Sequence, residues 1–518
     1  MKYTFPLLLM ISLLFPQMAI SCSICKTNFD GKTIVGDSLG KAEEKPFQKL
    51  SQLINEYAEN EIHKGNINSI ALAIYRNGEV FHNYYGEIDK NARNKPNDNT
   101  LYEIASISKV FVGSLTAKAV LEGKIKLDDD IRLYLKGEYQ NLEYENTPIT
   151  IKNLLTHTLG FKTKTPTKLE EINRKTSEGY YENRPFDYNM TDFLEELKMV
   201  ELDKKPGTFY DYNSIGSELL AYILEQVYHQ SYNNLLQNFL DELKMKNTYL
   251  QDYQNHKQNI SNSYTSSGKL APKDKNPLIG GGYGIIMTLP DLVKLMKFQL
   301  ESDNPLIKES RRILYEDDQD NVMGYLWQDM GVGKEEGFYY SKTGDSYGVR
   351  SGILICPDSN YGQIIIINNK SDEALADWET LYNKIETDLI KFPKINLKSI
   401  LKTQFLDNPK TAKKEFNLLK KQEENYFNTN LEHTLNSLGY DLLYGDKNVN
   451  KAIEIFEFAT KEYPKNANLF DSLGEAYFVN KAYDKAILNY NKSLMLNPKN
   501  DNAKEMILKI NQLLSAKK

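Results

Sequence analysis

Runs of apolar residues mark two β-rich regions, one near the start of the chain and one before residue 370. Each region has two short runs that are rich in β-branched and aromatic residues and are separated by turn-forming residues. Asn77-Gly78 in the first region is typical of a tight hairpin turn. The predicted strands are residues 69–75 and 80–85 in the first region, and residues 349–356 and 363–367, around a turn at 357–360, in the second.

Between these β-rich regions the pattern is mostly helical, with apolar residues recurring at helical spacing. A further helical segment begins near residue 47, after a polar stretch. Strands at both ends with helices in the middle predict an α+β domain. We expect its first and last strands to pair in one antiparallel sheet.

Beyond about residue 390 the strand pattern stops, and a Lys- and Glu-rich helical pattern follows. The spacing there resembles the 34-residue tetratricopeptide repeat, and Pro464 and Pro498 lie one such period apart. We predict stacked helical hairpins with a capping helix at residues 501–514. The matching positions are Leu438, Gly439, Ala452, Phe456 and Ala459 in the first copy, and Phe470, Leu473, Gly474, Tyr477, Ala486, Tyr490 and Ser493 in the second.

The first 21 residues are typical of a secretory signal peptide, because one lysine precedes an apolar run at residues 5–15. That run is too short to cross a bilayer comfortably. The sequence Ala19-Ile20-Ser21-Cys22 resembles a bacterial lipobox, which would place a lipid on Cys22. We therefore expect an exported protein of the periplasm or cell envelope, with Cys22 as the candidate attachment point for a lipid anchor in a membrane.

The composition narrows the range of partners. A net charge of −6 and a pI near 5.8 argue against nucleic acid, because phosphate contacts need concentrated Lys and Arg. Cys22 and Cys25 lie at the predicted cleavage junction, and Cys356 is interpreted as a packed strand residue, so we expect no disulfide framework. The Cys22 and Cys25 pair has no second pair to complete a metal site, and we predict neither a metal nor another cofactor.

One of several Ser-x-x-Lys sequences suggests catalysis. Ser106 opens an apolar-periodic stretch, which places it at a helix N-terminus with Lys109 one turn further on and facing the same way. A serine hydroxyl needs an adjacent base to become a good nucleophile, and a helix N-terminus favours a developing oxyanion. The alternative is a helix-capping serine beside a surface lysine. The same pattern also occurs at Ser23, Ser38, Ser266, Ser399 and Ser515.

The only Lys-Thr-Gly sequence, Lys342-Thr343-Gly344, lies beside the second β-rich region. Ser-x-x-Lys together with Lys-Thr-Gly is found in β-lactamases and penicillin-binding proteins. A lysine on a strand offers positive charge to a substrate carboxylate, and a glycine leaves the strand edge open to an extended substrate. The pairing favours the catalytic interpretation of Ser106.

These and other motifs resemble the class C β-lactamase and D-alanyl-D-alanine carboxypeptidase family over residues 47–385. His157 lies in a segment similar to the family's Leu-Leu-x-His-x-Ser-Gly, with Leu159 in place of Ser, and we expect it to be structural. The matching segments are residues 104–109, residues 149–160, Pro206-Gly207-Thr208 followed by Tyr212, residues 282–292 with Asp291, and Tyr325-Leu326-Trp327.

The resemblance implies roles for individual residues. Tyr212 would be a second general base or acid, kept ionisable by the positive charges of Lys109 and Lys342. The backbone N–H groups of Ser106 and Asp345 would form the oxyanion hole. Thr343, Gly344 and Asp345 would line the substrate site. Ser214 stands where the family has an amide that holds the substrate, while the adjacent Asn213 should point elsewhere, so β-lactam recognition should be weakened.

The sequence therefore predicts five segments and an acyl-transfer enzyme. The leading hypothesis is a serine hydrolase with a Ser106 acyl intermediate, acting on a peptide ending in a D-residue, a β-lactam or a small ester. One alternative is a degenerate domain that binds cell-wall peptides without turnover, with the repeats as its working surface. The repeats could also be a structural appendage that only packs against a neighbouring domain, or bind a protein partner. The segments are a signal peptide at 1–21, a linker at 22–46, the hydrolase domain at 47–390, a helical linker at 391–430, and repeats with a capping helix at 431–518.

Overall fold

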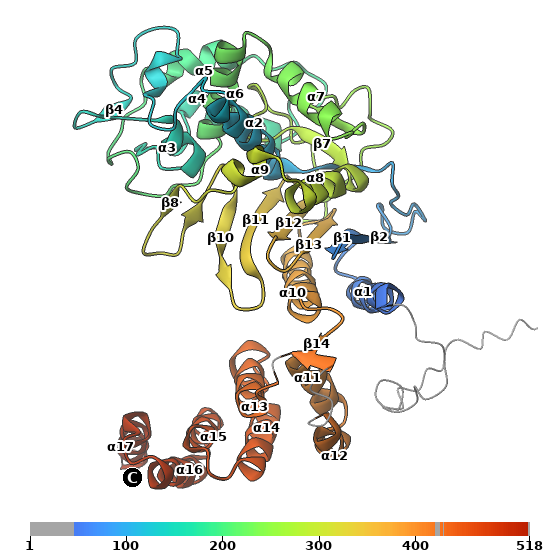
Figure 1. Ribbon diagram of the computed structural model, residues 1–518, viewed down its shortest axis with the longest axis vertical. Coiled ribbons are helices and arrows are strands. Elements are labelled where there is room, and N and C mark those ends of the chain that lie inside the picture. Colours follow the sequence, from blue (N-terminus) through green and yellow to red (C-terminus); the bar gives the residue numbers. More distant parts are fainter. Residues whose placement is uncertain (1–45, 420–424, 428, 516–518) are drawn as a thin grey trace, which may run out of the picture. The chain divides into compact units, whose positions relative to one another are not determined.

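The computed structural model describes residues 46–419, 425–427 and 429–515. The predicted signal peptide, Cys22 and nearly all of the first predicted linker lie outside these residues. A six-stranded antiparallel sheet in the order β10-β11-β12-β13-β1-β2 is the centre of the first part of the fold (Figure 1). Its strands are β1 (Ser69–Arg76), β2 (Glu79–Gly86), β10 (Gln328–Gly333), β11 (Gly337–Asp345), β12 (Arg350–Cys356) and β13 (Tyr361–Ile367).

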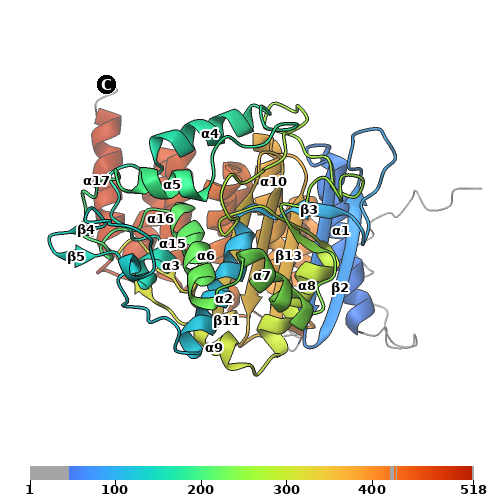
Figure 2. The same ribbon diagram turned by 90° about the horizontal axis from the view of Figure 1, so that it is seen from above.

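The predicted pairing of the first and last strands is confirmed. Strand β1 pairs with β13 in antiparallel register, with Ile70 opposite Ile367. Both strands are almost continuously apolar because the sheet is covered on both faces, by helix α8 (Leu289–Glu301) on one and helix α10 (Asp372–Leu389) on the other (Figure 2). Cys356 is a buried free thiol at the end of β12, as predicted.

A helical layer and a small three-stranded sheet, β3-β7-β6, precede helix α8 in the chain. The sequence did not predict this small sheet, because its strands are only three or four residues long. The other elements of the first part are α1 (Pro46–Lys64), β3 (Leu101–Glu103), the 3-10 turn Ala105–Ser108, α2 (Lys109–Leu121), a 3-10 turn Ile131–Leu133, β4 (Glu143–Tyr144), β5 (Thr147–Pro148), α3 (Ile151–Thr156), α4 (Thr167–Ser177), α5 (Met190–Leu197), α6 (Ile215–Tyr228), α7 (Tyr232–Glu242), β6 (Thr248–Leu250), β7 (Ile285–Thr288), α9 (Pro305–Ser310), β8 (Tyr315–Glu316) and β9 (Val322–Met323).

In its described residues, the C-terminal region is helical apart from one two-residue strand pair, and its helices fit a repeat array. Helices α11 and α12, within the predicted linker, belong to the same apolar cluster as the helices that follow them. The glycines and aromatic residues of the sequence repeat lie where neighbouring helices meet. The elements are β14 (Ile395–Asn396), α11 (Leu397–Asp407), α12 (Pro409–Leu419), β15 (Tyr426–Phe427), α13 (Leu431–Tyr440), a π-helical turn Asp441–Gly445, α14 (Val449–Glu462), α15 (Ala467–Val479), α16 (Tyr483–Leu496) and α17 (Asp501–Ser515).

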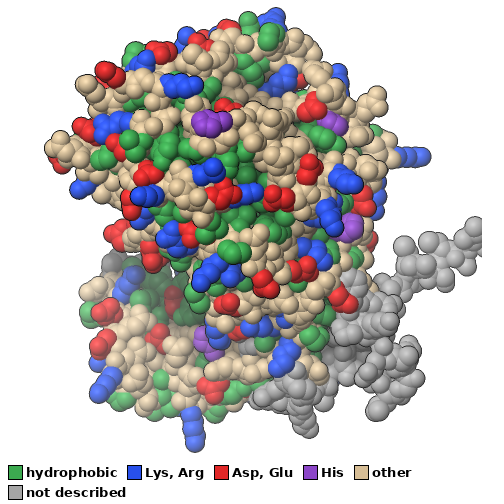
Figure 3. Space-filling view, turned by 45° about the horizontal axis from the view of Figure 1, so that its top comes forward, with side chains coloured by type: hydrophobic (Ala, Val, Ile, Leu, Met, Phe, Trp, Pro, Cys, Tyr) green, Lys and Arg blue, Asp and Glu red, His purple; other side chains and the backbone are tan. Residues whose placement is uncertain are grey.

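The surface carries charges of both signs. On the face shown in Figure 3, Lys and Arg side chains are interspersed with Asp and Glu side chains. Within the described part of the chain, no helix is both long enough and apolar enough to span a membrane.

Candidate active site

Ser106 lies in the 3-10 turn that leads directly into helix α2. The turn is closed by a hydrogen bond from the Ile107 N–H to the Ile104 carbonyl. Lys109 is the first residue of α2, and its side chain is fully buried. Its Nζ donates to Ser106 Oγ at 3.1 Å. The structure therefore brings together the hydroxyl and the ammonium group of the Ser-x-x-Lys sequence at the start of a helix.

The ammonium group of Lys109 is surrounded by hydrogen-bond acceptors. Besides Ser106, it donates to Ser214 Oγ at 3.1 Å and to the Gly282 carbonyl at 2.9 Å. A lysine ammonium has three donors and no acceptor. These contacts fix the position of the Lys109 ammonium group beside Ser106.

The phenol of Tyr212 lies between two ammonium groups. Lys109 Nζ is 5.2 Å from the centroid of its ring, and Lys342 Nζ is 5.0 Å from the same centroid. Burial by itself would raise the pKa of the Tyr212 phenol, but the two ammonium charges outweigh burial, and hydrogen bonds from Ser106 and Lys109 add to their effect, so the pKa falls to about 7. A substantial share of Tyr212 can therefore be phenolate at neutral pH and accept a proton from Ser106.

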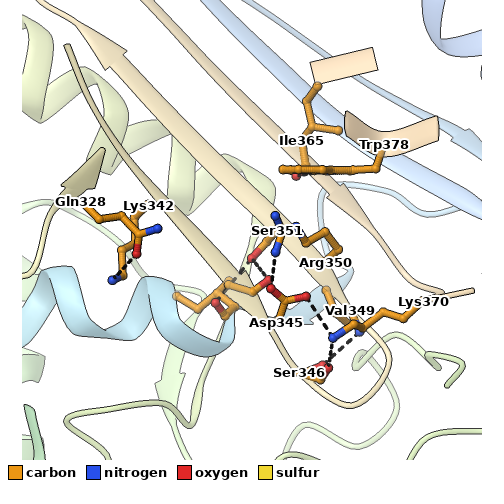
Figure 4. Close-up of polar contacts among 12 residues, drawn as sticks. Gln328, Lys342, Asp345, Ser346, Val349, Arg350, Ser351, Ile365, Lys370 and Trp378 are labelled. Atoms are coloured by element: carbon orange, nitrogen blue, oxygen red, sulfur yellow. Dashed lines mark hydrogen bonds and ion pairs between the residues drawn. The ribbon is translucent and has the colours of Figure 1, made fainter. Parts of the chain in front are cut away.

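Lys342 lies on strand β11 and is fully buried. Its Nζ donates to Gln328 Oε1 at 2.8 Å, from the neighbouring strand β10 (Figure 4). Burial lowers the pKa of Lys342 to about 8, while the Tyr212 phenol acts in the opposite direction. The sequence reasoning missed Gln328, although it directly follows the Tyr325-Leu326-Trp327 motif.

The residues after Lys342 point in different directions. Thr343 lines a cavity of about 490 Å³, together with Trp378 and Tyr382 of helix α10. A side chain at Gly344 would collide with the Ile104 carbonyl, so glycine lets strand β11 approach the segment that carries Ser106. This close approach is a reason for glycine that the sequence did not show.

The carboxylate of Asp345 points away from Lys342. It forms ion pairs with Arg350 and, at 2.9 Å, with Lys370 (Figure 4). These contacts anchor the end of β11. The side chain of Asp345 is therefore engaged away from Lys342, and its expected contribution to the site is its backbone N–H.

Ser214 directly precedes helix α6 and faces Lys109 through its hydroxyl. The neighbouring Asn213 is turned away, because its Nδ2 donates to the Asp211 carbonyl at 2.8 Å and its Oδ1 accepts from the Gly216 N–H at 3.2 Å. The side-chain amide of Asn213 therefore serves the local turn, as expected from the sequence.

His157 is fully buried and packs against Tyr212, with a distance of 4.5 Å between their ring centroids. Burial, reinforced by the charges of Lys342 and Lys109, lowers the pKa of His157 well below its usual value. The ring is therefore neutral at physiological pH and packs against the Tyr212 ring, in agreement with a structural role.

The chain is similar in sequence to known proteins. The family described as Beta-lactamase matches residues 50–384. The Staphylococcus aureus protein named flp is 29% identical over 330 residues, which cover 62% of this chain and 64% of that protein. The chain thus spans less than two thirds of this relative's length.

Solved structures show the same fold. A β-lactamase/D-alanine carboxypeptidase from Yersinia pestis superposes with a TM-score of 0.55 at 21% identity, covering 65% of this chain and 98% of that chain. A class C β-lactamase superposes with the same TM-score of 0.55, also at 21% identity, covering 67% of this chain and 98% of its own. The superpositions establish the fold.

Proposed function

The chain belongs to the β-lactamase family, and from this premise we propose that it is a serine hydrolase that works through a covalent acyl intermediate on Ser106. The observation that carries the proposal is the Tyr212 phenol, held between Lys109 and Lys342 and hydrogen-bonded to Ser106. Two buried ammonium groups on either side of one phenol are costly for folding. They are useful for a reaction in which a proton moves and negative charge develops.

The proposed reaction uses the side chains in a fixed order. The Tyr212 phenolate takes the Ser106 proton while Oγ bonds to the acyl carbon, and the carbonyl oxygen becomes an oxyanion facing the N–H groups of Ser106 and Asp345. When the tetrahedral intermediate collapses, the leaving group departs with the proton held by Tyr212. Water then repeats the sequence on the acyl-enzyme, and Ser106 regains its proton.

Lys342 supports a substrate that carries a carboxylate near the scissile bond. Gln328, which accepts from its ammonium group, is neutral, so this contact orients the ammonium group without neutralising its charge. A peptide that ends in a D-residue and a β-lactam both present such a carboxylate, and a small ester would react without using it. Ser214 in place of an amide weighs against efficient β-lactam turnover.

The first test is a comparison of three substrates with the purified full chain. We propose to assay a D-Ala-D-Ala peptide, a chromogenic cephalosporin and a short nitrophenyl ester, each with wild type and with Ser106→Ala. The proposal expects turnover of the ester and of the peptide above that of the cephalosporin, and loss of all turnover in Ser106→Ala. Binding of the peptide without turnover of any of the three would favour the alternative, a degenerate peptide-binding domain.

We also propose that the protein is exported and held in the cell envelope through Cys22, and that its C-terminal helices are tetratricopeptide repeats that bind a protein partner. The signal-like composition of residues 1–21 and the 34-residue spacing support these two points. Mass spectrometry of the native N-terminus tests the first of them. A cytoplasmic protein that retains Met1 would contradict it.

A further inference from the structure

The carboxylate of Glu218 is completely surrounded by hydrogen-bond donors. Glu218 lies in the first turn of helix α6 and is 1% exposed. Oε1 accepts from the Gly282 N–H and from Asn276 Nδ2, each at 2.7 Å. Oε2 accepts from the Gly280 and Gly281 N–H groups, at 3.0 and 3.2 Å. Three consecutive backbone donors thus converge on one buried side chain.

This arrangement suits an ionised carboxylate better than a protonated one. Burial raises the pKa of Glu218, while the hydrogen bonds from Gly282 and Asn276 act in the opposite direction. All four contacts come from donors, and a proton on the carboxyl would face one of them. Charge-assisted hydrogen bonds are also the stronger kind. Glu218 therefore fixes the conformation of the loop at residues 280–282.

The loop held by Glu218 ends at an acceptor of Lys109. The Gly282 N–H binds Glu218, and the Gly282 carbonyl accepts from Lys109 Nζ at 2.9 Å. A second acceptor of Lys109, Ser214 Oγ, precedes Glu218 by four residues, at the start of the same helix. Residues four apart lie on the same face of a helix. Helix α6 therefore positions two acceptors of Lys109, Ser214 directly and the Gly282 carbonyl through Glu218.

We infer that Glu218 is a positioning residue for catalysis: through the loop at 280–282 it holds Lys109 against Ser106 and Tyr212. This role rests on the proposed function. Without the carboxylate, the Gly282 carbonyl is free to move and Lys109 loses a fixed acceptor. The ammonium group then spends less time beside the Tyr212 phenol, and the phenol holds its proton more tightly.

The test uses Glu218→Gln in the full chain, with Asp291→Asn as the matched control. The glutamine amide can accept from at most two of the four donors and sets its own N–H₂ group against the others. Asp291 is also buried: it accepts from the Asn247 N–H at 2.6 Å and from Thr248 Oγ1 at 2.9 Å, and forms an ion pair with Lys294 at 2.7 Å. These partners are distinct from those of Lys109. Both substitutions therefore remove a buried carboxylate, but only Glu218→Gln removes one that is linked to Lys109.

Two quantities are measured in each variant beside the thermal unfolding midpoint. The first is the titration of Tyr212, taken as the tyrosinate absorbance of each background minus that of its Tyr212→Phe derivative. The second is the rate of Ser106 acylation by an activated ester. We expect Glu218→Gln to move the Tyr212 titration upward by about one pH unit and to slow acylation by about 10- to 100-fold. Asp291→Asn should lower the unfolding midpoint without changing the Tyr212 titration or the acylation rate.

The outcomes separate positioning from general stability. An unchanged Tyr212 titration in Glu218→Gln, or equal shifts in both variants, would overturn the inference. If Glu218→Gln does not fold, Asn276→Ala removes one donor to Glu218 and should produce a smaller shift in the same direction. An upward titration shift in a protein whose wild type forms no acyl adduct would support the positioning role while refuting the proposed hydrolase activity.

Discussion

The buried core around Ser106 and the buried core of the C-terminal helices differ in whether they enclose charged side chains. The first encloses two lysines, Lys109 and Lys342, that are both 0% exposed. In the second, counted over the described residues from Ile395 onward, the buried polar side chains are uncharged amides and hydroxyls. A buried ammonium costs several kcal/mol unless its partners compensate.

This difference shows where evidence about function is concentrated. The C-terminal core consists of apolar and small residues that let helices stack. Its sequence therefore indicates a stacked helical fold and no particular chemistry. The core around Ser106 contains charges that stability alone would not select. The comparison predicts that changes in the first region alter chemistry far more than stability, and that changes in the second do the reverse.

The largest expected effect comes from Lys109→Met. Loss of the ammonium group should slow acylation by about 10²- to 10⁴-fold, because Ser106 loses its hydrogen-bonded partner and Tyr212 loses a neighbouring charge. The unfolding midpoint should stay the same or rise, because an apolar side chain of similar length replaces a buried charge. Stopped-flow acylation and calorimetry measure the two effects. Lys118→Met, on a partly exposed lysine of the same helix, is the control.

The rate of acylation should also depend on pH. The phenolate form of Tyr212 increases as pH rises through about 7, so acylation should fall about tenfold per pH unit below that value. Lys342 loses its charge as pH rises through about 8, so the use of a carboxylate-bearing substrate should decline above it. A narrow maximum between pH 7 and 8 is expected in the rate of peptide acylation. A flat profile from pH 5 to pH 9 would contradict the assigned roles.

Ser214→Asn should have a smaller effect, limited to substrate recognition. The serine hydroxyl contacts Lys109, and an amide there could accept from Lys109 and also donate to the substrate. One good hydrogen bond is typically worth about 0.5–1.5 kcal/mol, so cephalosporin turnover should rise by up to about tenfold. Turnover of the small ester in the same variant is the internal control. Unchanged cephalosporin turnover would contradict the predicted role of residue 214 in β-lactam recognition.

Gly439→Ala should leave the chemistry unchanged and weaken the C-terminal helices. A side chain at Gly439 would collide with the Phe456 ring, which overpacks the contact between helices α13 and α14 at a typical cost of about 1–3 kcal/mol. Hydrogen exchange in these helices should become faster, with the ester rate unchanged. Gly445→Ala, where the added methyl group meets no atom within 4 Å, is the matched control. A slower ester rate in Gly439→Ala would show that the two regions are coupled.

The strands and the order of motifs were predictable because they depend on local patterns. The Asn77-Gly78 turn specifies its hairpin, and the apolar runs of β1 and β13 require cover on both faces. Similarly, Lys-Thr-Gly beside a strand region indicated that Lys342 would lie on the sheet. Such signals are contained within a few neighbouring residues.

The supporting contacts of the site were not predictable in this way. Gln328 is a neutral residue without a motif of its own, and the Gly282 carbonyl is a backbone group that no residue pattern reveals. Glu218 has the periodicity of an ordinary helix residue, and its burial among four donors depends on a loop more than 60 residues away. Contacts of this range follow from the tertiary fold.

The central claim is that Ser106 is the residue acylated by substrate. Intact-mass measurement after incubation with an activated ester or a penicillin tests it most directly, when wild type and Ser106→Ala are compared and the labelled peptide is mapped. We expect one acyl group per chain in wild type, located on the peptide that contains Ser106, and no adduct in Ser106→Ala. An adduct that persists in Ser106→Ala, or one that maps to another residue, would contradict it.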